Sequence, residues 1–255
     1  EIDECAALLA GMLPEQALLL KLHGSLGAAE QDRALAPAPP GMRKVVLATN
    51  VAESSITIDG IAGVVDSGLE RRMRFDPAAG IPFLEVGPVS KASAAQRSGR
   101  AGRTRPGVAV RLWNAFEERS RPERTQPEIL EADLAGFALE IAAWGTPAEA
   151  LRWLDVPPSA RLAAARTLLT ELGAFDGGGR LTARGRELVR LPVHPRLGAM
   201  LLTARERGLL PLGCGIAALL EERDAFRGAR GADLRERLAG MCSNPGAFRN
   251  QLVQA

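Results

Sequence analysis

A short run of arginines separated by small residues is the part of this sequence best suited to chemistry. Within residues 96–103 (QRSGRAGR), Arg97, Arg100 and Arg103 recur every three positions, so a helical turn would place them on neighbouring faces. Guanidinium groups are planar, charged forks that match phosphate oxygens. The pattern therefore favours a phosphate-binding site, although a run of charge is more often a solvated basic helix or a nucleic-acid tail.

A second segment, upstream of the arginines, argues against the solvated helix. Residues 45–60 (VVLATNVAESSITIDG) pass from an apolar, β-branched run into hydroxyl, amide and carboxyl side chains. Thr49 and Asn50 come directly after the expected strand, at the carboxyl edge where α/β sheets present ligand-binding groups. Two long segments in this order are stronger evidence than one short motif.

The two segments together resemble motifs V and VI of superfamily 2 helicases, in the form used by the DEAH-box group. There the first reads approximately ATN-x-AE-[ST]-S-x-T-I-[DE]-G and the second QR-x-GRAGR, and both are matched almost letter for letter. Residues 191–197 (LPVHPRL) also resemble a stretch that follows the winged helix in this group. Within it the chain is most similar to bacterial HrpB-type ATP-dependent helicases, from near residue 1 to at least residue 226.

The resemblance implies that this chain supplies the second of two RecA-like lobes that enclose ATP. Gln96 would orient the attacking water or the γ-phosphate, and Arg100 and Arg103 would be arginine fingers on the γ-phosphate. Arg97 and Arg100 could instead pair only with local acids. The small residues around Arg103 allow close backbone approach, which argues against that alternative for this residue.

Further nucleotide contacts are implied within motif V. Asp59 matches a carboxylate that accepts from the ribose, with capping of the following turn as the competing role. Ser55 matches a position that senses the nucleotide state, with a structural hydroxyl as the alternative, and Thr57 is placed in the same nucleotide site. Many relatives carry a base-stacking aromatic ring where this chain has Leu35, so the resemblance does not extend to adenine stacking.

Contacts to a nucleic-acid strand are implied at two places. Thr49 and Asn50 match positions that touch the backbone, and their hydroxyl and amide groups suit contacts that read no sequence. Gly24 and Ser25 lie in the motif IV region, where a second contact is implied. The expected partners are single-stranded nucleic acid, taken as RNA, and the first RecA-like lobe. The implied cofactor is ATP with Mg²⁺, whose metal ligands are expected on that first lobe.

The elements that must position these groups alternate between short apolar strands and helices, which predicts an α/β fold with a RecA-like parallel sheet. Strands are expected at 17–22, 44–48, 61–65 and 107–113, and helices at 4–13 and 28–35. Two extended stretches around residues 76–80 resemble the β-hairpin that DEAH-box proteins insert in this lobe.

The character of the sequence changes after residue 113. Helical spacing from Leu130 to Trp144, a helix that Ser159 would cap, and a turn at 176–179 between extended residues form a winged-helix pattern. This wing is interpreted as a packing hub, with DNA reading as the alternative. Helices at 195–207 and 211–222 then resemble the start of a helical-bundle (ratchet) domain. The expected domains are residues 1–113, 114–190 and 191–255.

Composition limits the alternatives. The net charge is +2, and the three cysteines and two histidines are too few and too scattered for a disulfide framework or a metal site, so the cysteines are expected to be buried or inert in a reducing cytosol. No apolar run is long enough to span a bilayer, so a cytoplasmic location without membrane contact is expected. No protein partner is identified.

Two motifs of an ATP-hydrolysing motor do not occur in the sequence. It contains neither a G-x-x-x-x-G-K-[ST] loop nor an acidic DEAH-type box. The chain also starts at Glu1, so it is interpreted as a piece of a longer protein that is inactive alone. The alternative is a non-catalytic nucleic-acid-binding or adaptor protein with a degenerate helicase lobe.

Overall fold

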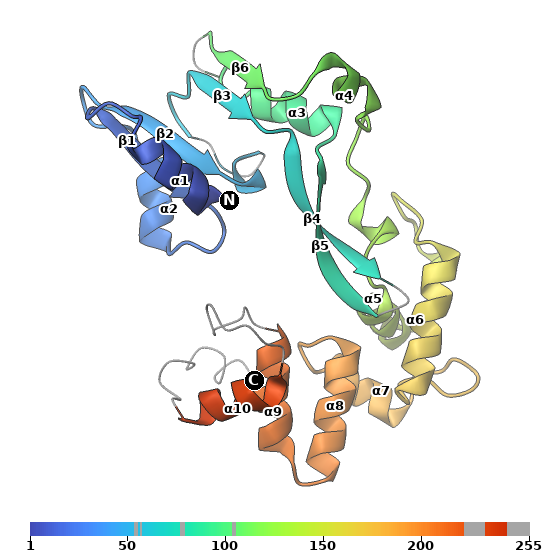
Figure 1. The fold of residues 1–255 in the computed structure, drawn as a ribbon. Coiled ribbons are helices and arrows are strands. Elements are labelled where there is room, and N and C mark those ends of the chain that lie inside the picture. Colours follow the sequence, from blue (N-terminus) through green and yellow to red (C-terminus); the bar gives the residue numbers. More distant parts are fainter. Residues whose placement is uncertain (54–55, 57, 77–79, 104–105, 222–232, 244–255) are drawn as a thin grey trace. The chain divides into compact units, whose positions relative to one another are not determined.

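The computed structural model describes residues 1–53, 56, 58–76, 80–103, 106–221 and 233–243, whose path is drawn in Figure 1. The chain divides into two compact units, Glu1–Pro127 and Glu128–Ala255. The domain boundaries expected after residues 113 and 190 stay predictions.

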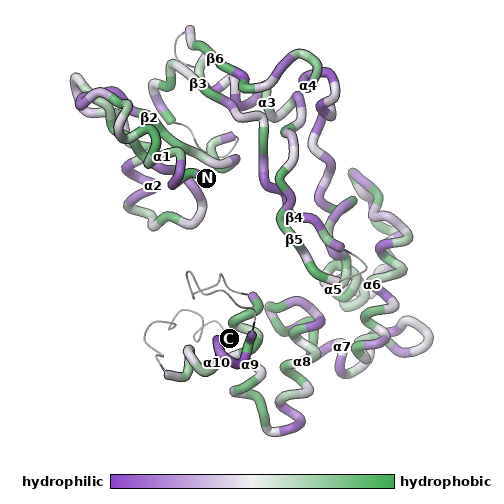
Figure 2. Tube along the Cα trace, in the orientation of Figure 1, coloured by the Kyte–Doolittle hydropathy of each residue, from purple (hydrophilic) through white to green (hydrophobic). Residues whose placement is uncertain are grey.

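The first unit is built from parallel strand pairs and a hairpin. Its strands are β1 (Ala17–Leu22), β2 (Arg43–Ala48), β3 (Gly63–Asp66), β4 (Leu69–Asp76), β5 (Ile81–Pro88) and β6 (Val108–Arg111). β1 pairs with β2 and β3 with β6, both in parallel, and β4 pairs with β5 antiparallel. The parallel pairing confirms the α/β prediction, although the described strands form separate two-stranded sheets. Figure 2 shows hydrophobic residues along β1 and β2, as their sequences require.

The helices of the first unit are α1 (Ile2–Ala10), α2 (Ala28–Leu35), α3 (Lys91–Ser98), α4 (Ala115–Ser120) and the 3₁₀ turn η1 (Asn50–Ala52). α3 starts at Ser90, whose hydroxyl accepts a hydrogen bond from the Ser93 N–H. α4 starts with a reciprocal capping box between Asn114 and Glu117. Both starts follow from side chains that satisfy the free N–H groups of a helix end. α3 ends at Ser98, and this end matters for the site.

The second unit is helical. It contains α5 (Ala135–Trp144), α6 (Ser159–Glu171), α7 (Ala183–Val189), α8 (Pro195–Glu206), α9 (Leu210–Glu221), α10 (Leu234–Ser243) and the 3₁₀ turns η2 (Glu128–Leu130) and η3 (Ala148–Ala150). One apolar core joins α5 to α8, and its fully buried members include Leu169 and Ala174. Between α6 and α7 an isolated β-bridge pairs Phe175 with Leu181, in the place of the expected wing.

Two local predictions, one on a helix cap and one on the cysteines, differ from the structure. Ser159 does not cap α6, because Pro158 holds the capping position and Ser159 is the first helical residue. The sequence predicts cysteines that are buried or inert; Cys5 and Cys242 are exposed and Cys214 is partly covered, so burial is wrong for the two exposed thiols and inertness stays a prediction. No described helix is long and apolar enough to cross a membrane. Within the described residues, no three metal-ligating side chains come together.

Candidate nucleotide and nucleic-acid site

The residues predicted to touch a nucleic-acid strand gather at one sheet edge. β1 and β2 are parallel and end level with each other, since Leu22 is paired with Ala48. Gly24 and Ser25 form the turn after β1, and Thr49 and Asn50 follow β2, all four exposed.

Two hydrogen bonds hold this edge in place. The Thr49 N–H donates to the Leu22 carbonyl at 3.2 Å, and the Ser25 hydroxyl lies 2.7 Å from Nδ1 of His23. The edge therefore presents hydroxyl, amide and backbone groups to solvent on a fixed frame, which suits contacts to phosphate and sugar.

The arginines of motif VI do not share one helix. Gln96 and Arg97 lie on α3, but α3 ends at Ser98, so Arg100 and Arg103 lie in the turns that follow. The prediction of neighbouring helical faces is therefore wrong. Gly99 and Gly102 break the helix, because glycine loses more conformational freedom in a helix than any other residue. Gln96 and Arg103 are exposed, whereas Arg100 is partly covered.

Arg100 binds the backbone of motif V. Its Nε donates to the Glu53 carbonyl at 2.9 Å, and a terminal nitrogen donates to the Ile56 carbonyl at 2.8 Å. Burial, followed by the positive charge of Arg103, lowers the pKa of Arg100. The charge of Glu53 acts in the opposite direction and raises it, so a nearby anion favours the charged form of Arg100.

The remaining predicted nucleotide residues are only partly described. Asp59 is exposed in a turn that Gly60 closes at φ 76°, a conformation that favours glycine. Its charge acts on Lys44, whose pKa is lowered by burial and raised by Asp59, with burial the stronger effect. Ser55 and Thr57 lie outside the described residues.

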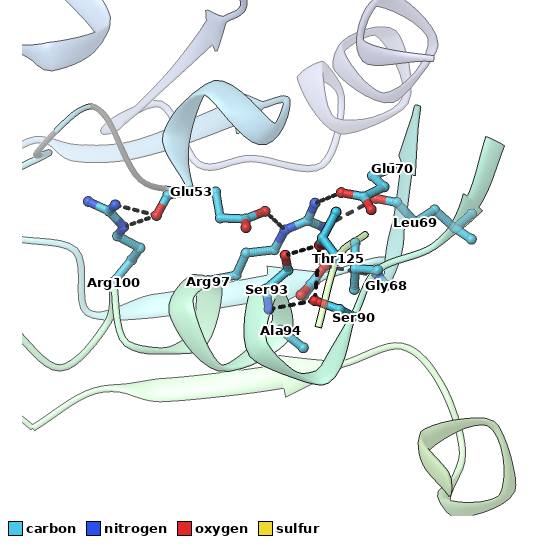
Figure 3. A network of polar contacts seen from close by, with 12 residues as sticks. Glu53, Gly68, Leu69, Glu70, Ser90, Ser93, Ala94, Arg97, Arg100 and Thr125 are labelled. Carbon is cyan, nitrogen blue, oxygen red and sulfur yellow. Dashed lines mark hydrogen bonds and ion pairs between the residues drawn. The ribbon is translucent and has the colours of Figure 1, made fainter. Parts of the chain in front are cut away.

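For Arg97 the structure shows the alternative that the sequence left open, pairing with acids, which the sequence could not name. Its Nε donates to the Glu53 carboxylate at 3.0 Å, and a terminal nitrogen donates to Asp66 at 3.0 Å and to the Leu69 carbonyl at 3.2 Å (Figure 3). Glu70 lies 3.9 Å from its other terminal nitrogen. Burial disfavours the charged guanidinium, but the bonds to Glu53 and Asp66 outweigh this effect and raise the pKa of Arg97.

Arg97 therefore joins motif V, β3 and the start of the hairpin. The pairing with local acids, left open by the sequence, holds for Arg97 and not for the side chain of Arg100. The sequence signal that could have indicated this pairing is an arginine of the motif placed inside the predicted helix, together with acidic residues at the ends of two predicted strands.

Sequence reasoning missed Arg121. It is 7% exposed, and one terminal nitrogen donates to the carbonyls of Gly68 and Val89, at 2.7 and 3.1 Å. Its guanidinium lies 4.1 Å from the centroid of the Trp113 ring, a cation–π distance. Gly68 precedes β4 and Val89 follows β5, so Arg121 holds the two ends of the hairpin together through these hydrogen bonds.

In the second unit, the 191–197 stretch has a structural role. His194 caps α8 by accepting from the Arg196 N–H at Nδ1, so Nε2 carries the ring proton and donates it to Asp133 at 2.9 Å. Asp133 accepts from the Ala135 N–H as well, at the start of α5. This pair ties the start of α8 to the start of α5.

Comparisons with known proteins bear on the family of the chain. The family "Helicase conserved C-terminal domain" matches residues 2–105, and "Helicase associated domain (HA2), winged-helix" matches residues 165–193. The chain is 45% identical over 224 residues to the ATP-dependent RNA helicase HrpB of Escherichia coli, covering 87% of the chain and 27% of that protein. It is 40% identical to the pre-mRNA-splicing factor ATP-dependent RNA helicase prp22 of Schizosaccharomyces pombe, covering 85% of the chain and 19% of that protein.

A solved structure gives the same result for the fold. The crystal structure of the E. coli DEAH/RHA helicase HrpB superimposes with a TM-score of 0.84 at 38% identity, covering 100% of this chain and 35% of that one. The chain thus spans well under half the length of the relatives it matches. The two motifs, the parallel strands that carry them and these similarities place the chain in the DEAH-box helicase family, among its HrpB-type members.

Proposed function

We propose that this chain is the C-terminal motor portion of an ATP-dependent RNA helicase, comprising the second RecA-like lobe, the winged helix and the start of the helical bundle. The observation that carries the proposal is that Arg100, bonded to the Glu53 and Ile56 carbonyls of motif V, lies in the same unit as the level ends of β1 and β2, which Thr49 and Asn50 follow. The printed names of HrpB and prp22 describe ATP-dependent RNA helicases and support it.

The residues on this chain would act on one side of the nucleotide. ATP supplies a phosphoanhydride bond whose hydrolysis releases free energy, and Mg²⁺ ligands are expected on the first lobe. Arg100 and Arg103 would stabilise the negative charge that develops on the γ-phosphate, and Gln96 would orient the attacking water. Arginine fingers of this kind contribute about 10³–10⁵ in rate. Asp59 would accept from the ribose, and Ser55 and Thr57 complete the proposed nucleotide contacts.

Strand binding is assigned to the sheet edge that carries Thr49, Asn50, Gly24 and Ser25. These groups read no base, so a motor that uses them can step along any sequence. In the proposed cycle, closure of the two lobes on ATP moves this edge along the strand, and the β4–β5 hairpin helps to part the duplex.

The direct test is the ATPase activity of the full-length protein with and without single-stranded RNA. We expect RNA to stimulate turnover. Replacing both Thr49 and Asn50 with alanine should weaken RNA binding by about 1–3 kcal/mol, the sum of two hydrogen bonds, and by a similar factor for unrelated sequences.

Two outcomes would overturn the proposal. A full-length protein that binds RNA without RNA-stimulated turnover would point to the adaptor alternative. A loss of affinity that depended strongly on sequence would indicate base readout rather than a translocating motor.

A further inference from the structure

The root of the β4–β5 hairpin, here Gly68, Leu69 and Val89, is hydrogen-bonded to Arg97 of α3, the helix that carries the start of motif VI. β5 ends at Pro88, and α3 begins two residues later at its buried cap, Ser90. The first N–H groups of α3 donate to the carbonyls of Pro122 and Glu123, at 2.9 and 3.1 Å. The start of α3, the end of the hairpin and the segment after α4 are therefore hydrogen-bonded into one block.

Arg121 closes this block from the other side. The Gly68 carbonyl accepts both from Arg121 and from the Val89 N–H, at 2.7 and 3.0 Å. A side chain at Gly68 would meet Arg121 and the Trp113 ring, with ring atoms from 2.6 Å away. The two ends of the hairpin thus have little freedom to separate.

Arg97 is the contact between this root and the nucleotide-facing turn. Its guanidinium binds Asp66 and the Leu69 carbonyl on the hairpin side and Glu53 on the motif V side. Its side chain and those of its partners Glu53 and Asp66 are no more than 14% exposed. Buried ion pairs of this kind are screened little by solvent, so separating Arg97 from Glu53 or Asp66 costs more free energy than separating an exposed pair.

Glu53 is the shared partner. Its carboxylate binds Arg97 while its backbone carbonyl binds Arg100, three residues further along the chain (Figure 3). A movement of Arg100 toward phosphate has to break or shift its bonds to Glu53 and Ile56, which anchor the motif V segment. Such a shift moves the same residue that holds Arg97.

We propose that Arg97 is a positioning residue that links nucleotide binding to the hairpin: a shift of Arg100 passes through Glu53 and Arg97 to the Leu69 carbonyl at the hairpin root, which Arg121 keeps intact as a unit. This inference rests on the proposed function. It assigns Arg97 to the use of hydrolysis for strand separation rather than to hydrolysis itself.

The test uses the full-length protein with Arg97→Lys. Lysine keeps the charge that balances Glu53, Asp66 and Glu70, but a single ammonium cannot reproduce the flat fork that reaches Glu53, Asp66 and Leu69 together. We measure RNA-stimulated ATP turnover and the base pairs unwound per ATP on a duplex with a single-stranded overhang. Turnover should stay within about twofold of the wild type, while base pairs per ATP fall about tenfold, the size of a modest coupling free energy between two sites.

A second readout does not depend on activity. Amide hydrogen exchange is followed in peptides that contain Gly68, Leu69 and Val89, with and without ADP–aluminium fluoride. In the wild type the nucleotide analogue should change exchange at this root, and in Arg97→Lys it should not. Arg205→Lys is the matched control, because Arg205 forms an exposed ion pair with Glu187 in the second unit. The control should behave as the wild type in both measurements.

The outcomes separate this inference from the proposed function. A wild type without RNA-stimulated turnover would overturn the function, while exchange would still report on Arg97. A wild type that unwinds, with Arg97→Lys equal to it in base pairs per ATP and in exchange, would overturn the link alone. If Arg97→Lys melts well below the wild type, Arg121→Lys replaces it. Arg121→Lys should loosen the root in both nucleotide states and lower base pairs per ATP, and normal coupling there would count against the link.

Discussion

At the scale of single residues, one motif uses the same side chain for two purposes. Arg97 stabilises the fold by pairing with buried carboxylates, whereas Arg100 and Arg103 lie beyond the end of α3, and Arg100 binds backbone carbonyls of motif V. The difference comes from position: a residue inside α3 faces the acids at the strand ends, and a residue after Gly99 does not. Substitutions at the three arginines should therefore have different signatures.

Arg103→Lys in the full-length protein is the substitution that best separates a catalytic role from a structural one. Lysine keeps the charge but loses the planar fork that can reach two phosphate oxygens, so kcat should fall by about 100-fold or more while nucleotide Kd changes little. Steady-state turnover, nucleotide binding and melting temperature are measured on the one variant. A folded Arg103→Lys protein with near-normal kcat would contradict the arginine-finger assignment. A lowered melting temperature with proportional loss of activity would instead indicate a structural role.

At the scale of elements, the hairpin depends on a glycine at its root. Gly68 has φ 70°, a conformation that L side chains rarely adopt, and a Cβ there would meet Trp113 and Arg121. Gly68→Ala should therefore destabilise the first unit by about 1–3 kcal/mol. Gly87→Ala is the matched control, because Gly87 lies in β5 of the same hairpin with no atom within 4 Å of an added Cβ.

Urea unfolding of the two variants checks this prediction. The control should stay within about 0.5 kcal/mol of the wild type, as surface substitutions usually do. Equal midpoints for Gly68→Ala and Gly87→Ala would show that the root is looser than its contacts indicate.

The hydrogen bond between His194 and Asp133, which joins the starts of α8 and α5, predicts that the stability of the second unit depends on pH. Burial raises the pKa of Asp133, but hydrogen bonds from His194 and the Ala135 N–H outweigh it, so the pKa lies below its ordinary value. The unfolded chain then binds more protons, so this carboxylate stabilises the fold fully above the ordinary pKa of about 3.9 and stops doing so as pH falls below it.

Asp133→Asn isolates that contribution. The variant should be less stable than the wild type by about 1.5–3 kcal/mol near neutral pH, the contribution of a hydrogen bond to a charged group. The gap should narrow below about pH 4. Glu140→Gln, on the exposed side of α5, is the control and should give a gap near zero throughout. A gap for Asp133→Asn that does not change with pH would exclude the ionised pair as its cause.

Prediction from sequence succeeded where a pattern is local. The apolar run at 17–22 coincides with β1 and the helical spacing at 28–35 coincides with α2, because both elements have simple periodicity and clear breakers. It failed where partners are distant along the chain. Arg97 meets Glu53 and Asp66 from 44 and 31 residues away, and Arg121 meets Gly68 from 53 residues away.

The candidate site divides in the same way. Thr49 and Asn50 follow a strand by simple order, so their place at the sheet edge could be predicted. The end of α3 at Ser98 could not, because element boundaries depend on packing and capping as well as on pattern.

At the scale of the whole molecule, the chain holds only one side of the proposed nucleotide site. It has no phosphate loop and no acidic box, which bind the phosphates and Mg²⁺ in motors of this class. Purified residues 1–255 should therefore show no RNA-stimulated ATP turnover, while the full-length protein does. Mutation-sensitive turnover by the purified chain, lost in Arg103→Lys, would contradict the assignment of this chain to the second lobe.

The contact between Arg121 and Trp113 has an optical consequence. Indole fluorescence responds to a nearby cation, and Trp113 has one 4.1 Å from its ring centroid at the hairpin root. The other two tryptophans, Trp144 and Trp153, lie in the second unit and can be replaced by phenylalanine. The remaining tryptophan emission then comes from Trp113 at the hairpin root alone. Its intensity therefore reports changes in the contact between Arg121 and Trp113 over time, without an attached dye.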